Sequence, residues 1–197
     1  MAGKRRGRPS ASAERNTREA ILTSTRDLLS KNGFERTTIR AVAAGAEVDA
    51  ALVHHYFGTK MTLVGEALAP PVDFAAVFED MPTDATAGPE FVRRALRLWE
   101  SPQVRAHVVG VLRLVSSSAD VAALVRDIPG TIVQAALGSA VRDDHRDRRL
   151  ALIASHMLGL LMLRFVIGDP DMVAADSDGL ATQIGPVIAH YLQGELE

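Results

Sequence analysis

The stretch TTIRAVAAGAEVDAALVHHYFGTK, residues 37–60, decides the fold of this chain. Its first half carries apolar residues at helical spacing, directly after Thr37 and Thr38, whose hydroxyl groups can cap the first exposed amides of a helix. Its second half begins with Asp49, whose carboxylate suits both a cap and the positive end of a helix dipole. The pattern therefore predicts two short helices joined by a tight turn near residues 45–47.

The second of these helices is expected over residues 49–57 and has two distinct sides. Val53 and Phe57 are four residues apart and mark its buried side. At about 100° per residue, Ala51 and His55 then lie on the opposite side. Two short helices joined by a tight turn form a helix-turn-helix, whose second helix enters the DNA major groove. The same periodicity is also compatible with a plain helical hairpin inside an all-α protein.

The order T-x-R-x-V-A, followed by V-D-x-x-L-V-x-H-Y-F-G-T-K, resembles the DNA-binding domain of the TetR-type (tetracycline-repressor-like) regulators. The resemblance covers residues 17–68 and implies a dimeric transcription regulator that releases DNA when a small molecule binds its larger C-terminal domain. It also assigns phosphate contacts to Tyr56 and Lys60. The chain departs from the family pattern at Glu47, where glycine is usual. Either Glu47 adopts the positive φ that a tight turn often needs, or Gly45 carries the bend.

Small and imidazole side chains, without carboxylates, form the expected DNA-reading surface. Alanine and leucine side chains can pack against thymine methyl groups, and a histidine can reach a base acceptor or a phosphate. The residues expected to contact DNA are Thr38, Arg40, Ala50, Ala51, Leu52, His54, His55, Tyr56 and Lys60.

Charge is distributed unevenly along the chain. Residues 1–60 contain 11 Lys and Arg against 6 Asp and Glu, whereas residues 61–197 contain 11 against 18. A basic end and an acidic remainder suit a protein that presents one end to a polyanion, although a basic tail that only aids solubility gives the same count. Residues 1–13 are expected to be a flexible arm that can reach phosphates or the minor groove. Its basic residues are Lys4, Arg5, Arg6 and Arg8.

Composition and periodicity predict an all-α protein with a small N-terminal domain and a larger C-terminal one. With 47% apolar residues and 197 residues in all, the chain can build a sizeable core, and it has no cysteine for disulfides or thiolate metal sites. The basic N-terminus is not followed by an apolar signal region, so we expect a cytoplasmic protein. Residues 14–68 are expected to form the three-helix helix-turn-helix domain and residues 71–197 the helical effector-binding and dimerisation domain. The later helices are expected at about 72–80, 89–99, 102–117, 119–141 with a break at Pro129-Gly130, 143–167 and 176–193.

The run Leu150–Ile167 is apolar on nearly every face. A membrane span is one interpretation, since about 20 apolar residues suffice. His156 and Arg164 interrupt the run, so we favour a helix that packs inside its own chain on one face and against a partner on the other. The resemblance implies a four-helix dimer contact made by the last two long helices. The residues expected there are Leu150, Ile153, Leu158, Leu161, Ile184, Val187, Ile188 and Tyr191.

Chemistry-bearing motifs are missing from the sequence. No two histidines are spaced i, i+4, and there is no HExxH motif, glycine-rich phosphate loop or G-x-S-x-G elbow, so we expect no enzyme activity, no metal and no cofactor. Apolar residues of the C-terminal domain, with His107 and Arg113 to orient a ligand, could line a pocket, although ordinary core packing explains each of them as well. The pocket candidates are Phe91, Trp99, His107, Val108, Leu112, Arg113, Met157, Leu161 and Phe165.

These features together predict a sequence-specific DNA-binding transcriptional regulator. We expect a homodimeric repressor that a small, largely apolar ligand releases from a palindromic operator. The alternatives are an all-α ligand carrier or enzyme with an incidental helix-turn-helix, and a structural DNA-binding protein without a ligand.

Overall fold

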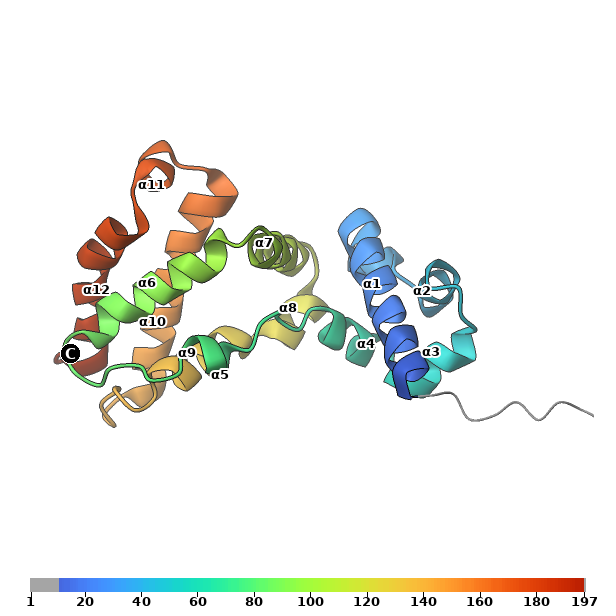
Figure 1. Cartoon of the computed structure of the whole chain (residues 1–197), viewed down its shortest axis with the longest axis horizontal. Helices are drawn as coiled ribbons and strands as arrows, with labels where there is room; N and C mark the ends of the chain where they lie inside the picture. The colour runs from blue at the N-terminus through green and yellow to red at the C-terminus, as the bar shows by residue number, and fades with distance from the viewer. Residues whose placement is uncertain (1–10, 197) are drawn as a thin grey trace, which may run out of the picture. The chain divides into compact units, whose positions relative to one another are not determined.

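The structure, a computed structural model, describes residues 11–196 and places the side chains from Glu14 onward. Helices and their connections make up this whole range, with no strand in it, so the all-α prediction is confirmed. The helices are α1 (Ala11–Arg36), α2 (Ile39–Gly45), α3 (Ala50–Phe57), α4 (Lys60–Ala67), α5 (Phe74–Val77), α6 (Ala87–Glu100), α7 (Pro102–Ser117), α8 (Ala119–Val125), α9 (Ile128–Leu137), α10 (Arg146–Leu161), the π-helix η1 (Met162–Ile167), α11 (Pro170–Ala174) and α12 (Ser177–Gln193) (Figure 1).

Two compact units make up the described chain. Unit 1 contains the chain up to Ala69 together with Arg113–Leu124, and unit 2 contains Pro70–Leu112 and the chain from Val125 onward. The domain expected over residues 71–197 therefore differs from unit 2, because Arg113–Leu124 groups with the N-terminal helices. One reason is the contact of Leu124 with α4, where a Cβ built on Gly65 would lie 3.4 Å from Leu124 Cδ1.

Unit 1 has a small apolar core made by α1 to α4. Ile21, Val42, Val53 and Leu63, one from each of these helices, are almost completely buried in it. Phe57 and Ala67, four residues after Val53 and Leu63, are buried in the same core, so α3 and α4 each turn one apolar stripe inward. Arg26 adds a polar tie, because its Nε donates to the Ala67 carbonyl at 3.0 Å and so joins α1 to α4.

The end of α1 and the start of α2 use the two threonines differently. Gly33 has φ 74°, the positive value that glycine adopts without a steric penalty. The buried Thr37 donates its hydroxyl to the Gly33 carbonyl at 2.8 Å, so it holds the end of α1. Thr38 caps α2, since its Oγ1 accepts from Ala41 N at 3.1 Å. Of the two expected caps, only Thr38 serves as one.

Unit 2 is built around α6, α9, α10 and α12, which share one core (Figure 1). The backbones of α6 and α12 approach closely at two glycines. A Cβ built on Gly88 would lie 2.3 Å from the Gly185 carbonyl oxygen, and one on Gly185 would lie 2.6 Å from Pro89 Cα. Only hydrogen atoms fit in these places, so the pairing of α6 with α12 depends on both glycines.

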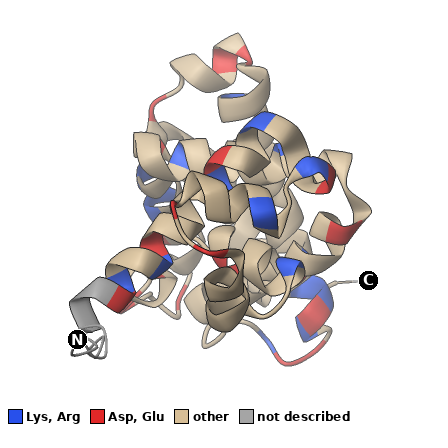
Figure 2. Cartoon of the chain, turned by 90° about the vertical axis from the view of Figure 1, so that its right-hand side faces the viewer, with Lys and Arg blue, Asp and Glu red and all other residues tan. Residues whose placement is uncertain are grey.

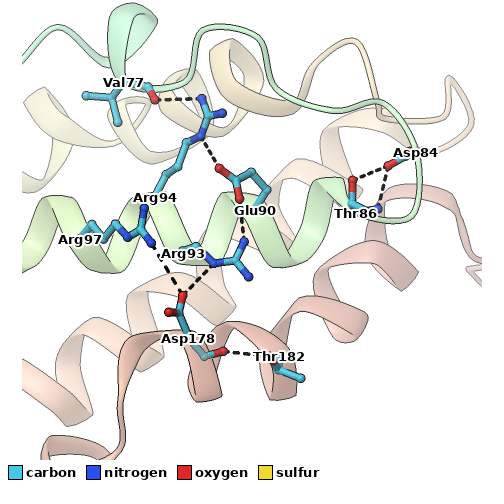
Figure 3. A network of polar contacts seen from close by, with 9 residues as sticks. All are labelled: Val77, Asp84, Thr86, Glu90, Arg93, Arg94, Arg97, Asp178 and Thr182. Atoms are coloured by element: carbon cyan, nitrogen blue, oxygen red, sulfur yellow. Dashed lines mark hydrogen bonds and ion pairs between the residues drawn. The ribbon is translucent and has the colours of Figure 1, made fainter.

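A polar network on α6 also connects this helix to α12 (Figure 3). Arg93 Nε donates to Asp178 Oδ1 of α12 at 2.8 Å, and Glu90 accepts from Arg94 Nε at 2.7 Å and from Arg93 Nη1 at 2.6 Å. The hydrogen bond from Arg94, and then that from Arg93, hold the pKa of the Glu90 carboxyl below its usual value. Arg94 also donates to the Val77 carbonyl at 3.3 Å, so the network joins α5, α6 and α12.

Arg149 of α10 is the largest fully buried side chain, and its guanidinium is hydrogen-bonded on all three nitrogens. It donates to the carbonyls of Tyr191 and Gly194 at 2.8 and 2.9 Å, where α12 ends. Its Nε donates to the Asp144 carbonyl at 2.8 Å, and its Nη2 donates to Asp144 Oδ2 at 2.9 Å. The hydrogen bond to Oδ2 lowers the pKa of the Asp144 carboxyl. The buried charge is thus paired, and it fixes the end of α12 against α10.

The structure differs from the expected C-terminal helices in four places. The helix expected at residues 72–80 is only the short α5. The break predicted at Pro129-Gly130 lies earlier, because Pro129 falls in the first turn of α9, where proline needs no amide. α11 was not expected. The helix predicted through residue 167 changes to a π-helix at Met162, and Arg164 there donates to the Met172 and Ala175 carbonyls at 2.5 and 2.7 Å.

One helical stretch among residues 11–196, Arg146–Ile167, is long and apolar enough to cross a membrane, and 28% of its most apolar window is buried within the chain. It combines α10 and η1. Its inner face carries Arg149, Ile153 and Met157, all buried in unit 2. Packing of a core helix explains this face.

Candidate nucleic-acid interface

The turn between α2 and α3 contains backbone hydrogen bonds and one residue in the left-handed conformation. Val48 N donates to the Ala43 carbonyl at 2.9 Å, and Glu47 has φ 55°. Gly45 does not take the positive φ, and its Cα instead faces the Ser24 hydroxyl of α1. Of the two alternatives for the bend, the structure therefore has Glu47 in the strained conformation.

Replacing Glu47 by glycine is expected to stabilise the chain. Glu47→Gly removes the Cβ that makes φ 55° unfavourable, and should raise the free energy of unfolding by about 1 kcal/mol after the entropy cost of glycine. Glu47→Ala is the matched control, because it removes the carboxylate and keeps the Cβ. Chemical denaturation of the three proteins checks this, and equal gains for Gly and Ala would show that the backbone is not strained.

α3 is held in place by its cap and by two buried residues. Asp49 Oδ1 accepts from Ala51 N at 2.7 Å at the start of the helix, as the sequence predicted. Val53 and Phe57 are buried in the unit 1 core, also as predicted. The opposite face presents Ala51, His54 and His55 to solvent, and Ala50 and Leu52 are partly buried beside it.

The two histidines of α3 differ in their surroundings. His54 Nδ1 lies 2.9 Å from the Gly58 carbonyl oxygen, and Gly58 N donates back to the His54 carbonyl at 2.8 Å. The His55 ring meets the Tyr56 ring edge-on at 5.6 Å. The structure therefore fixes the ring of His54 through the helix C-terminus, whereas that of His55 is fixed by an aromatic contact.

Lys60 and Tyr56, which the resemblance placed at phosphates, are both partly buried. Lys60 Nζ donates to the Phe34 carbonyl at 2.7 Å and lies 4.0 Å from the centre of the Phe34 ring. An ammonium group has three donors, so this bond leaves others for a phosphate. Lys60 therefore has a structural role besides the expected one. Thr38, the cap of α2, and Arg40, within α2, are both exposed.

The charge of the described part of this region is close to balanced. Residues 11–60 carry 7 Lys and Arg against 6 Asp and Glu. Figure 2 shows basic and acidic residues interspersed along the helices. The basic excess of residues 1–60 thus belongs almost wholly to Lys4, Arg5, Arg6 and Arg8, which lie outside the described residues.

A small apolar cavity in unit 2 holds several of the expected ligand-binding residues. The empty space there is about 160 Å³, part of it open to solvent, and it is too narrow for a separate water molecule, so a ligand could enter only if side chains move. Of the expected residues, Trp99, Val108, Leu161 and Phe165 line it. Arg105 and Val109 also line it and were missed. They are four residues apart on α7, and Arg105 is three residues before Val108, so the helical spacing could have revealed them.

The other expected pocket residues lie elsewhere. Phe91 and Met157 belong to the unit 2 core. His107, Leu112 and Arg113 are on α7 but do not line this cavity.

The residues expected at a dimer interface divide into two groups. Ile153 and Ile188 are fully buried, and Leu150 and Leu161 nearly so, in the unit 2 core or beside the cavity. In the single chain these four side chains therefore leave little surface for a second chain. Leu158 and Val187 are exposed, and Ile184 and Tyr191 are partly buried.

Comparison with known proteins identifies the class. Residues 21–67 match the family model described as bacterial regulatory proteins, tetR family, and residues 85–192 match the tetracyclin repressor-like C-terminal domain. A TetR-family regulator from Streptomyces coelicolor has a similar structure, with 30% sequence identity, a TM-score of 0.71, and coverage of 96% of this chain and 99% of that one. GusR of Salmonella enterica shares the fold at 16% identity, a TM-score of 0.65, and coverage of 89% and 95%.

A curated relative matches over part of its length. The HTH-type transcriptional repressor KstR of Rhodococcus jostii is 40% identical over 60 residues, which span 30% of this chain and 28% of KstR. With both family models matched in order, the chain belongs to the TetR family of regulatory proteins.

Proposed function

We propose that this protein is a sequence-specific transcriptional repressor that binds its operator as a homodimer in the cytoplasm. The observation that carries the proposal is the capped, carboxylate-free outer face of α3, with Ala51, His54 and His55 exposed and Val53 and Phe57 anchoring the helix below. A helix that presents small and imidazole groups can approach bases and phosphates without repulsion. The similarity of 60 residues of the chain to a repressor supports repression as the direction of regulation.

Dimerisation would use a surface that we call the α10–α12 seam. It consists of exposed residues with no formal charge when histidine is neutral: Ala151, Ser155, Leu158 and Gly159 of α10, and Gln183, Pro186, Val187 and His190 of α12. The two helices pack on each other, and the rings of His156 and Tyr191 lie 6.3 Å apart beside both rows. A Cβ built on Gly159 would meet nothing within 4 Å, which leaves room for a second backbone. A second chain on this seam accounts for the apolar outer face of α10 without a membrane.

A ligand would enter the unit 2 cavity by moving its aromatic wall. The rings of Trp99 and Phe165 meet edge-on at 6.4 Å, and Arg105 lies 5.8 Å from the Phe165 ring centre. Five of the six lining residues are apolar, which suits a small, largely apolar ligand. A ligand that spreads these side chains would favour a conformation with lower DNA affinity, and by linkage DNA would oppose its binding.

The basic arm would supply much of the sequence-independent attraction to DNA. Each phosphate contact contributes a slope of about 0.9 to the dependence of log affinity on log salt. Replacing Lys4, Arg5, Arg6 and Arg8 by glutamine is therefore expected to reduce the slope by about 3 to 4 per chain. Titrations of one DNA duplex between low and moderate salt measure it. Arg126→Gln, in an exposed residue of unit 2, is the control, and an unchanged slope in the fourfold variant would remove the arm from the interface.

Selection of bound DNA tests the proposed function. The full chain is mixed with fragments of its own genome, and the retained fragments are sequenced. We expect a few upstream regions to be enriched, each with a twofold-symmetric sequence. Trp99 is the only tryptophan of the chain, so quenching of its fluorescence can then identify compounds that enter the cavity. Adding these compounds to the protein on a retained fragment shows which of them release the DNA. An all-α carrier or enzyme would bind ligands and enrich no fragment.

A further inference from the structure

The outer face of α3 contains one side chain whose hydrogen-bonding role the backbone determines. His54 Nδ1 is 2.9 Å from the Gly58 carbonyl oxygen. A carbonyl oxygen can only accept a hydrogen bond, so Nδ1 must carry the proton. In a neutral imidazole the other nitrogen, Nε2, is then an acceptor.

The arrangement around Gly58 keeps this tautomer in place. Gly58 has φ 68° and ends α3, and its amide donates to the His54 carbonyl at 2.8 Å. Two hydrogen bonds therefore connect residues 54 and 58, one through the backbone and one through the ring. The ring is exposed, so its Nε2 edge remains available to a ligand on the outer face of the helix.

Because Nε2 of a neutral His54 is an acceptor, several DNA groups cannot form a hydrogen bond with it. Phosphate oxygens, guanine O6 and N7, and thymine O4 are all acceptors, and a neutral His54 cannot bond them through Nε2. The exocyclic amino groups, N6 of adenine and N4 of cytosine, are the donors of the major groove. From the sequence alone, a histidine here was expected to donate to a base acceptor or a phosphate, and the bond to Gly58 reverses that role.

We propose that His54 is a specificity residue that reads an exocyclic amino group, on adenine or cytosine, at one position of each half-site. The proposal rests on the proposed function, because it needs α3 in the major groove. Ala51, on the same face three residues earlier, offers a methyl group that suits a thymine methyl at a neighbouring position.

Selection from random DNA with the full-length protein tests this. The wild type is expected to enrich adenine or cytosine at one position of each half-site. His54→Phe keeps an aromatic ring but has no acceptor, so the preference at that position should disappear. His54→Arg should change the preference to guanine, whose O6 and N7 match a guanidinium. His55→Phe is the matched control on the adjacent residue, and it should keep the preference.

A base analogue tests the same atom in the unmodified protein. If the position is adenine, purine in its place lacks only the N6 amino group, and if it is cytosine, 2-pyrimidinone lacks only N4. Wild-type affinity should fall about tenfold, the loss expected for a missing base hydrogen bond, and His54→Phe should bind both duplexes equally.

The outcomes separate this inference from the proposed function. A wild type that enriches no sequence contradicts the proposed function and the inference with it. Sequences that are enriched equally by the wild type and His54→Phe, or an analogue that costs the wild type nothing, overturn the inference alone.

Discussion

Gly185→Ala is expected to lower the free energy of unfolding by about 3 kcal/mol, the upper range for forcing a methyl group into a packed core. The added Cβ would lie 2.5 Å from Pro89 Cγ and 2.6 Å from Pro89 Cα, and backbone cannot rotate away as a flexible side chain can. Gly88→Ala should act similarly, since its Cβ would meet the Gly185 carbonyl oxygen at 2.3 Å. Denaturation with urea, followed by circular dichroism, measures both.

Gly110→Ala is the control for these substitutions. Gly110 lies inside α7, and a Cβ there meets nothing within 4 Å. Alanine is a better helix former than glycine, so this variant should gain up to about 1 kcal/mol. If all three variants were equally stable, the close approach of α6 and α12 would not be a feature of the folded protein.

Leu158→Glu is expected to give a folded monomer whose operator affinity is at least about 100-fold lower, because a dimer gains that much from binding two half-sites at once. Leu158 is 43% exposed in the single chain, so a carboxylate there remains hydrated when the chain is alone. In a symmetric dimer this carboxylate would be buried near the same carboxylate of the second chain, with no positive charge beside it, at a cost of several kcal/mol. Val187→Glu, on the other helix of the α10–α12 seam, should behave alike.

The exposed positions make this test sharper than a substitution at Leu161 or Ile188. Those two side chains are 5% and 0% exposed, so a charge there would unfold the chain whether or not it dimerises. Ala135→Glu on the exposed side of α9 is the control and should remain dimeric. Sedimentation and operator titration are read together. A Leu158→Glu protein that stays dimeric with full affinity would place the interface elsewhere.

The helix-turn-helix could be predicted in detail because its signals are local. A capping residue acts on amides two or three positions away, as Asp49 does on Ala51 N, and the buried pair Val53 and Phe57 is set by the helical period. The turn was predicted less fully. Glu47 offers no local signal for φ 55°, so the sequence left the choice between it and Gly45 open.

Long-range features could not be predicted from the sequence, since they depend on which helices meet. Gly88 lies just before the helix expected from residue 89, yet it falls within α6 at the close contact with α12. Arg149 was hidden in a charged run, and its burial follows from the carbonyls left at the end of α12. Likewise, the apolar run of α10 indicates burial but does not say which residues face the core, as Ile153 does, and which remain outside, as Leu158 does.

Nucleotide-resolution footprinting of the full chain on a selected genomic fragment tests the central claim most directly. A dimer that inserts one α3 per half-site should protect two patches related by a twofold axis, with their centres separated by a whole number of helical turns. It should also show close contacts in the major groove of each half-site. A single protected patch, or protection that does not depend on sequence, would contradict a dimeric repressor that reads DNA through α3.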